Sequence, residues 1–172
     1  TGNHPFDLPA FHQLFRRLPN VDAYPQSLAD FVADAEGVRD TYVVLVFYNF
    51  HQVMPGESEG APGWLQGTRD VLTSLGESDQ GIVILHHGLL AFRDWAFWSE
   101  LVGIENRQSH FYPEQRVRVE IAGSDHPITT GLSPWTMVDE TYTMDEPDPA
   151  CRVLLRTDHP RSLRALAWTH TF

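Results

Sequence analysis

Two adjacent histidines, His86 and His87, follow the apolar run "GIVIL" and precede a run that predicts a helix. A turn at the head of a buried strand presents its side chains to a ligand, and imidazole acts as a general base, a general acid or a metal ligand near neutral pH. Asn49 and His51 follow a second apolar run, "YVVLVFY". The sequence therefore predicts a site after these runs, in which at least one of the paired histidines takes part. The alternative is that one imidazole bonds a backbone carbonyl and the other packs under the helix.

Further candidate residues lie in separate turns of the chain, which holds nine histidines in 172 residues. They are His4 in "GNHPF", His110 in "RQSHFYP", His126 in "SDHPITTGL", and the adjacent carboxylates Asp139 and Glu140 before Tyr142 in "DETY". Each also has a purely structural interpretation, because histidines cap turns and acidic pairs occur in solvated loops. We expect a packing or surface position, and no function, for His12, His159 and His170.

Several familiar signatures are missing from the sequence. It has no His-Glu-x-x-His or paired-cysteine spacing, so a metal site would have to assemble from separate loops. It has neither Gly-x-x-x-x-Gly-Lys nor Gly-x-Gly-x-x-Gly, so ATP and NAD are not indicated. The single cysteine, Cys151, has no neighbouring base in the sequence and is predicted to be structural.

The elements that must position these residues follow from the apolar spacing. Asp7 and Ser27 are expected to cap helices, because apolar residues recur after each at helical intervals. The two uninterrupted apolar runs predict strands that are covered on both faces, as in a parallel sheet. Residues 117–121 alternate between apolar and charged side chains, which predicts a strand nearer an edge of the sheet. Two further strands are expected at 152–156 and 165–170, and helices at 64–75 and 92–102. Together these elements predict an α/β fold in three layers: an open, mostly parallel sheet with helices on both faces.

Size and charge limit the class of protein. A chain of 172 residues predicts one domain. Its net charge of −11, from 23 acidic and 12 basic residues, would repel a phosphate backbone, so no nucleic acid partner is expected. No apolar run approaches the roughly 20 residues of a spanning helix, and no signal peptide pattern is visible, so we expect no membrane association and a cytoplasmic location.

Four motifs in the same order, "GNHPF", "GIVILHHGLLAFRDWAFWSELVG", "HPITTGL" and "DETY", resemble the trehalose utilisation (ThuA-like) family. The resemblance implies a class I glutamine amidotransferase-like, flavodoxin-like fold. In amidotransferase relatives the turn after the second buried strand bears a nucleophilic cysteine. Here His86 occupies it, so cysteine-dependent glutamine hydrolysis is not expected. The resemblance also implies one domain over residues 1–172 that lacks the family's first strand and its C-terminal strand and turn.

Two functions follow as expectations. The first is an enzyme of carbohydrate catabolism that acts on trehalose-like disaccharides or their keto-sugar derivatives. The second is a non-catalytic module that binds a sugar or a partner protein on a fold that has lost its cysteine. In the enzyme, His86, His110 and Glu140 would be catalytic, and His4, His87, His126, Asp139 and Tyr142 would bind substrate.

Two kinds of chemistry remain open for this enzyme: acid/base catalysis by histidine and catalysis assisted by a metal ion. A divalent metal such as zinc, where one is bound, would be held by His86, His4 and His110. The adjacent carboxylates Asp139 and Glu140 would point apart in an extended segment, which disfavours a two-carboxylate glycosidase. The expected partner is a small sugar, and the aromatic residues at 92–98 suggest a homodimer.

Overall fold

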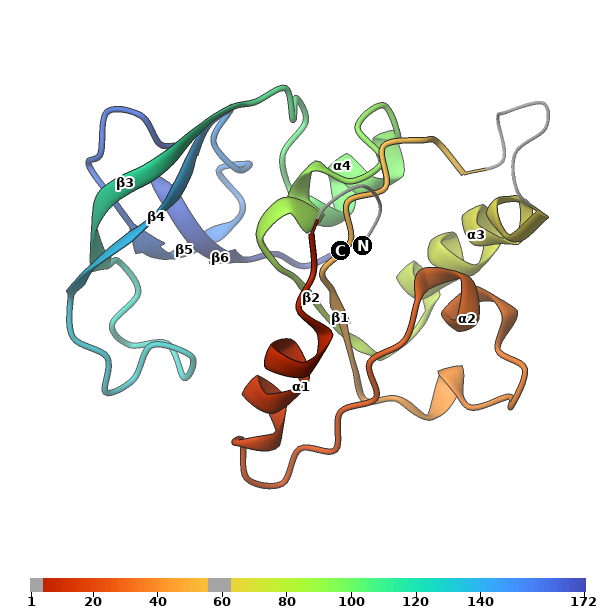
Figure 1. Cartoon of the computed structure of the whole chain (residues 1–172). Helices are drawn as coiled ribbons and strands as arrows, with labels where there is room; N and C mark the ends of the chain where they lie inside the picture. Colours follow the sequence, from red (N-terminus) through yellow and green to blue (C-terminus); the bar gives the residue numbers. More distant parts are fainter. Residues whose placement is uncertain (1–4, 56–62) are drawn as a thin grey trace. The chain divides into compact units, whose positions relative to one another are not determined.

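The computed structural model describes residues 5–55 and 63–172, with the backbone alone at 63–66. The chain forms two compact units, residues 1–94 (the first unit) and residues 95–172 (the second unit), and each is described by itself. Figure 1 shows the helices and the parallel strands of the first unit, and the antiparallel strands of the second.

The first two helices begin where the sequence places hydrogen-bonding caps. α1 (Leu8–Arg16) follows Asp7, whose carboxylate accepts a hydrogen bond of 2.9 Å from a backbone N–H in the first turn. α2 (Leu28–Ala33) follows Ser27, whose hydroxyl oxygen accepts one of 3.1 Å. These caps satisfy amides that have no partner inside the helix. The predicted starts of both helices are confirmed.

The two uninterrupted apolar runs form a parallel pair of strands. β1 (Val44–Phe47) pairs with β2 (Gly81–Ile84) in register from Val44↔Gly81 to Phe47↔Ile84. α3 (Gly63–Ser74) lies between them in the chain and supplies the long crossover that a parallel pair needs. Short 3₁₀ helices precede each strand, at Arg39–Thr41 and Leu75–Glu77.

The strands are covered on one face, and the prediction of coverage on both faces is wrong. Leu45 and Phe47 of β1 are buried, and the Phe47 ring lies edge-on to that of Phe31 in α2 with centroids 6.2 Å apart. On the opposite face, Val46 is 38% and Val83 is 41% exposed. A continuous apolar run therefore does not establish two covered faces here, since valine also favours a half-exposed strand.

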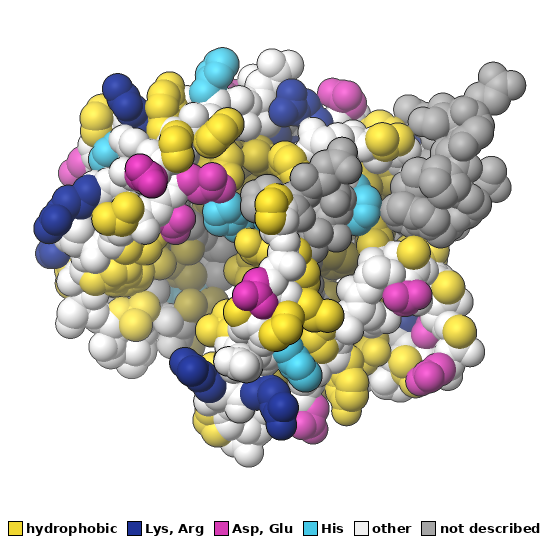
Figure 2. All heavy atoms as spheres, viewed as in Figure 1, with side chains coloured by type: hydrophobic (Ala, Val, Ile, Leu, Met, Phe, Trp, Pro, Cys, Tyr) yellow, Lys and Arg dark blue, Asp and Glu magenta, His cyan; other side chains and the backbone are white. Residues whose placement is uncertain are grey.

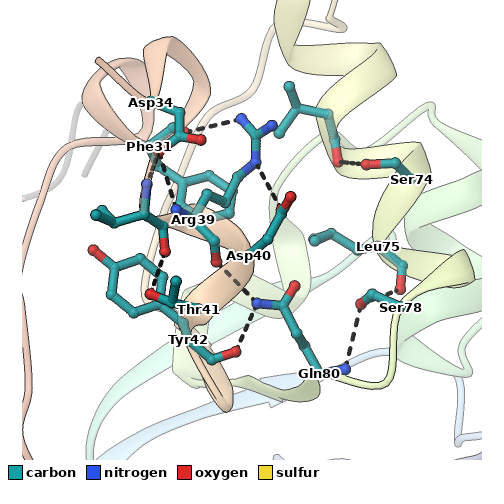
Figure 3. A network of polar contacts seen from close by, with 12 residues as sticks. Phe31, Asp34, Arg39, Asp40, Thr41, Tyr42, Ser74, Leu75, Ser78 and Gln80 are labelled. Carbon is teal, nitrogen blue, oxygen red and sulfur yellow. Dashed lines mark hydrogen bonds and ion pairs between the residues drawn. The ribbon is translucent and has the colours of Figure 1, made fainter. Parts of the chain in front are cut away.

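A polar network holds the amino-terminal ends of the strand pair (Figure 3). The side-chain amide of Gln80, just before β2, donates to the carbonyl oxygens of Arg39 at 3.0 Å and Tyr42 at 2.7 Å, both before β1. The carboxylate of Asp34 accepts from the N–H groups of Val38 at 2.9 Å and Arg39 at 3.0 Å. These bonds help to fix the register at the end of the pair opposite the histidines.

The second unit is built on an antiparallel sheet. Its strands are arranged in the order β4-β3-β5-β6, and each neighbouring pair is antiparallel. Val117, Val119, Leu154 and Ala165 form part of its core. The bounds are β3 (His110–Ile121), β4 (Trp135–Thr143), β5 (Arg152–Arg156) and β6 (Ala165–Thr169).

The predicted three-layer, mostly parallel sheet with helices on both faces is wrong, and with it the amidotransferase-like architecture. The described chain has one parallel pair and a separate four-stranded antiparallel sheet. The connections explain the difference, because a parallel pair needs a crossover of about a dozen residues or more, whereas an antiparallel pair needs only a short turn. Residues 157–164 alone join β5 to β6.

The surface mixes apolar and charged side chains (Figure 2). On the face that Figure 2 shows, the described arginine side chains lie in several separate places. α1 buries none of its residues, and Leu8 and Leu14 are each at least half exposed. Within the part of the chain that the structure describes, no helix is long and apolar enough to cross a membrane.

The last helix of the chain ends at a glycine in a crowded place. α4 (Ala96–Val102) is capped by Gly103 at φ 78°, whose N–H bonds to the carbonyls of Ser99 and Glu100. Only glycine adopts such a left-handed conformation without strain. A Cβ atom at position 103 would stand 2.7 Å from the Sγ atom of Cys151.

Replacing Gly103 by alanine is therefore expected to destabilise the protein through both strain and crowding. Gly131 provides the matched control, since its φ is 83° and a Cβ there would meet nothing within 4 Å. Gly131→Ala should cost about 1 kcal/mol, the strain alone. Gly103→Ala should cost about 1–2 kcal/mol more, because the sulfur or the backbone must shift. Urea unfolding measures both, and equal losses would show that the crowding is unimportant.

Candidate functional site

The carboxyl-terminal ends of β1 and β2 lie at one edge of the strand pair and carry the histidines. Just beyond Phe47↔Ile84, the last residue pair in register, the N–H of Leu85 donates to the carbonyl oxygen of Phe47 at 2.9 Å. The chain then turns into the 3₁₀ helix η3 (His86–Leu90). A Cβ atom at Gly88 would come within 2.9 Å of that same carbonyl oxygen. Glycine at 88 therefore lets this turn lie close against β1.

His86 and His87 contact each other through their rings. The Nδ1 atoms are 3.0 Å apart, and the ring planes are almost perpendicular at 86°. His86 has a φ of 53°, an uncommon left-handed conformation for a residue other than glycine. His87 is 1% exposed. At this distance one Nδ1 donates and the other accepts, so the tautomers of the two imidazoles depend on each other.

Aromatic rings hold the inner histidine in place. The Tyr48 ring lies 4.5 Å from that of His87 and 6.2 Å from that of His86, between centroids. The Phe50 ring meets the His87 ring in a T-shaped arrangement at 5.3 Å. Tyr48 and Phe50 directly follow β1, so the end of one strand positions the histidines that follow the other.

His51 is half-buried beside the same turn, and its imidazole is neutral at neutral pH. Its ring stacks on Phe92 with centroids 6.0 Å apart and planes at 10°, and its carbonyl oxygen accepts the N–H of Phe92 at 2.7 Å. Burial is the main cause that lowers the pKa of His51 from 6.5 to about 4. A neutral imidazole in this position suits packing and hydrogen bonding more than holding a positive charge.

This shift of pKa predicts a loss of stability in acid. Between pH 6.5 and pH 4 the unfolded chain binds a proton at His51 that the folded chain does not, so stability falls as the pH falls through this window. The expected loss is about 1–2 kcal/mol, less than the whole shift would give because the ring is partly in contact with water. His51→Phe keeps an aromatic ring on Phe92 without the proton site. Urea unfolding from pH 4 to 7 should give it the flatter profile, and parallel profiles would refute the assignment.

In the second unit, Glu140 and Tyr142 form a second candidate group. The Tyr142 hydroxyl donates a hydrogen bond to Oε1 of Glu140, two residues earlier on β4. The Asp139 carboxylate accepts the N–H of Glu140 at 2.9 Å, and Asp139 is exposed whereas Glu140 is half-buried. His110 begins β3, pairs with Thr143 and is exposed. The segment "DETY", which we interpreted as loop or extended chain, is thus part of a strand.

The motif around His126 forms a turn. The Nδ1 atom of His126 accepts the N–H of Ile128 at 3.2 Å, and its carbonyl oxygen accepts the N–H groups of Thr129 and Thr130, each at 3.0 Å. These bonds support the structural interpretation of this histidine. Binding of substrate by His126 stays a prediction.

The predicted metal ligands come from separate parts of the chain. His4 lies outside the described residues, while His86 belongs to the first unit and His110 to the second. Within residues 5–55 and 63–172, no group of three or more His, Cys, Asp or Glu side chains could hold a metal ion. The proposed set of three therefore stays a prediction, because one of its members is not described.

Sequence reasoning missed one neighbour of Cys151. The Cys151 Sγ atom lies 3.5 Å from Nδ1 of His170, a residue 19 positions away. The thiol is buried, and this burial is the main cause that raises its pKa. A raised pKa keeps the thiol protonated, which agrees with the structural role predicted from sequence. Spacing in the sequence offered no signal for this pair, because Cys151 precedes β5 and His170 follows β6, and the two meet only when these strands pair.

Comparison with known proteins identifies the family. No curated protein and no solved structure matches this chain. The family model described as ThuA, trehalose utilisation, matches residues 35–172, which include β1, β2, the paired histidines and the whole second unit. The match covers most of the chain and agrees with the resemblance seen in the motifs. The chain belongs to the ThuA trehalose utilisation family, and its role lies in carbohydrate metabolism.

Proposed function

We propose that this chain is an enzyme of trehalose utilisation in which His86 transfers a proton to and from a sugar substrate. The substrate class is trehalose or trehalose with one ring hydroxyl oxidised to a ketone, called keto-trehalose below. The observation that carries the proposal is the contact of 3.0 Å between the Nδ1 atoms of His86 and His87 at the end of the strand pair. The family membership supplies the sugar.

The geometry of the pair suits a general base. A general base needs a neighbour that fixes its tautomer and orientation, as the third member of a catalytic triad does. His87 is buried and held between aromatic rings, so it is a rigid neighbour for His86. A bond between the two Nδ1 atoms assigns the chemistry to Nε2 of His86, the ring nitrogen that does not face His87.

A ketone in the sugar gives this base a proton to remove. A carbon next to a carbonyl loses its proton far more easily than other sugar carbons, because the negative charge spreads to the carbonyl oxygen. In the proposed step the C–H bond breaks, its electron pair stays on the sugar as an enolate, and the proton goes to Nε2 of His86. The same nitrogen then returns the proton, as a general acid, to the former carbonyl carbon. The proton of the hydroxyl on the neighbouring carbon passes to the enolate oxygen, so the carbonyl has moved by one carbon along the ring. No further reactant is needed for this step.

The proposal is tested by measuring turnover and binding of trehalose and keto-trehalose in parallel. An enzyme that works by this step consumes keto-trehalose and loses that turnover, but not its affinity, when His86 is replaced. A non-catalytic module binds a sugar without consuming it, and this result would overturn the proposal. Repeating the assay after chelation distinguishes proton transfer by His86 from a role as a metal ligand, because only the metal-dependent reaction is lost to the chelator.

A further inference from the structure

The side chain of Asn49 is a buried polar group with no hydrogen-bond partner among the described residues. Asn49 is 7% exposed, and its amide atoms Nδ2 and Oδ1 are both shielded from solvent. Neither atom has a hydrogen-bond partner within the part of the chain that the structure describes. Buried amides are nearly always paired, because leaving water without a new partner costs free energy. This side chain therefore requires an explanation other than folding.

An apolar residue at position 49 would serve the fold better. Leu45, Phe47 and Asn49 alternate with more exposed residues, so they share the buried side of β1 and its extension. Asparagine is among the residues least suited to a strand, whereas an apolar side chain would continue the core. Such a conflict between a residue and its local environment is typical of functional positions.

Asn49 lies at the same edge of the strand pair as the paired histidines. Phe47↔Ile84 is the last pair in register, and Asn49 and His86 each follow it by two positions on their own strands. Ligands of parallel sheets bind at the carboxyl-terminal edge, beyond the strand ends. The unpartnered amide therefore belongs to the edge where the proposed site is found.

The chemistry of an amide selects the kind of ligand. Nδ2 donates two hydrogen bonds and Oδ1 accepts, so a full partner must offer both acceptors and donors side by side. Neighbouring hydroxyls of a sugar ring, or a hydroxyl beside a ketone, meet this requirement, whereas an apolar ligand or a simple ion meets half of it or none. We infer that Asn49 binds the sugar in the proposed site. Nδ2 donates to the oxygen of one hydroxyl or ketone group on the sugar ring, and Oδ1 accepts from the neighbouring hydroxyl. This inference rests on the proposed function and names the residue that recognises the hydroxyl pattern.

The test combines stability with affinity. Asn49→Leu replaces the amide by an apolar group of similar size, and Asn49→Ala removes it without adding bulk. An unpartnered amide contributes nothing to folding, so both variants should keep or raise the melting temperature. Both should bind trehalose or keto-trehalose about ten- to hundredfold more weakly, because two hydrogen bonds are lost. Asn106→Leu is the control, since Asn106 is exposed and bonded to the N–H of Gln108, and it should bind like the wild type.

Two results would overturn the inference and leave the proposed function intact. One is wild-type affinity in both Asn49 variants. The other is a fall of more than about 4 °C in the melting temperature of both, which would mean that the amide has a structural partner such as a buried water. Failure of the proposed function is seen separately, as wild-type protein that binds neither sugar, and that result would also remove the ligand assigned to Asn49.

Discussion

Replacing His86 by asparagine is expected to lower kcat on keto-trehalose by about 10²- to 10⁴-fold, the usual contribution of a positioned general base. Asparagine suits this position because it tolerates the left-handed backbone, at φ 53° in His86, better than other residues, yet it cannot take up a proton. KM and the melting temperature should change little, since the fold and the sugar contacts are kept. Steady-state kinetics and thermal unfolding measure these quantities.

The control is the same substitution at His12, a half-buried residue of α1. His12→Asn should leave kcat unchanged. Equal losses in both variants would show that substitution of any histidine impairs the protein. Unchanged kcat in His86→Asn would remove His86 from the reaction and reject the proposed mechanism.

The second large effect is expected at His87, which acts as a positioning residue. His87→Phe keeps a ring against Tyr48 and Phe50 but loses the nitrogen that faces His86 at 3.0 Å. The imidazole of His86 then loses the bond that selects its tautomer. We expect kcat to fall by about ten- to hundredfold, the usual cost of removing such an outer partner, with KM unchanged.

A variant that restores a hydrogen-bonding group separates positioning from packing. His87→Asn places an amide where Nδ1 stood, so it should recover part of the lost kcat although it packs less well than phenylalanine. If the rate follows the melting temperature through both variants instead, His87 acts through packing alone. That result would contradict the role given to it here.

Short patterns in the sequence predicted helices and strands well where hydrogen-bonding caps or apolar spacing determine them. The caps at Asp7 and Ser27 define the helix starts, and the apolar runs define β1 and β2. The alternation around Val117 and Val119, which are both buried, also predicted the last part of β3. The prediction that this strand lies nearer an edge is wrong, because β3 begins at His110 and pairs with β4 on one side and β5 on the other. In each case the pattern that predicts the element lies within a few consecutive residues.

The arrangement of the strands into sheets was harder to predict, because it depends on contacts between residues that are distant in the sequence. The short connection from β5 to β6 held enough information to predict an antiparallel pair, but the alternation of helices and strands earlier in the chain suggested a parallel sheet throughout. β4 was missed because its polar residues, such as Asp139 and Glu140, mark it as a loop. Strands with one face in water carry such residues, so composition alone does not reveal them.

The parallel pairing of the two strands before the candidate residues could be predicted from the sequence, whereas the contacts among those residues could not. The ends of two parallel strands pointed to Asn49, His51, His86 and His87. The ring contact between His86 and His87 could not be foreseen, because two adjacent side chains face each other only when the backbone turns as it does at His86. The unpaired amide of Asn49 likewise emerges only from burial.

Hydrogen exchange on the substrate tests the central claim, proton transfer by His86, most directly. Keto-trehalose is incubated with the protein in D₂O, and mass spectrometry follows deuterium entering the carbon next to the carbonyl. The account predicts that the wild type and His12→Asn incorporate deuterium well above the protein-free rate, whereas His86→Asn does not. Incorporation by His86→Asn at the wild-type rate, or none by the wild type above the buffer alone, would contradict it.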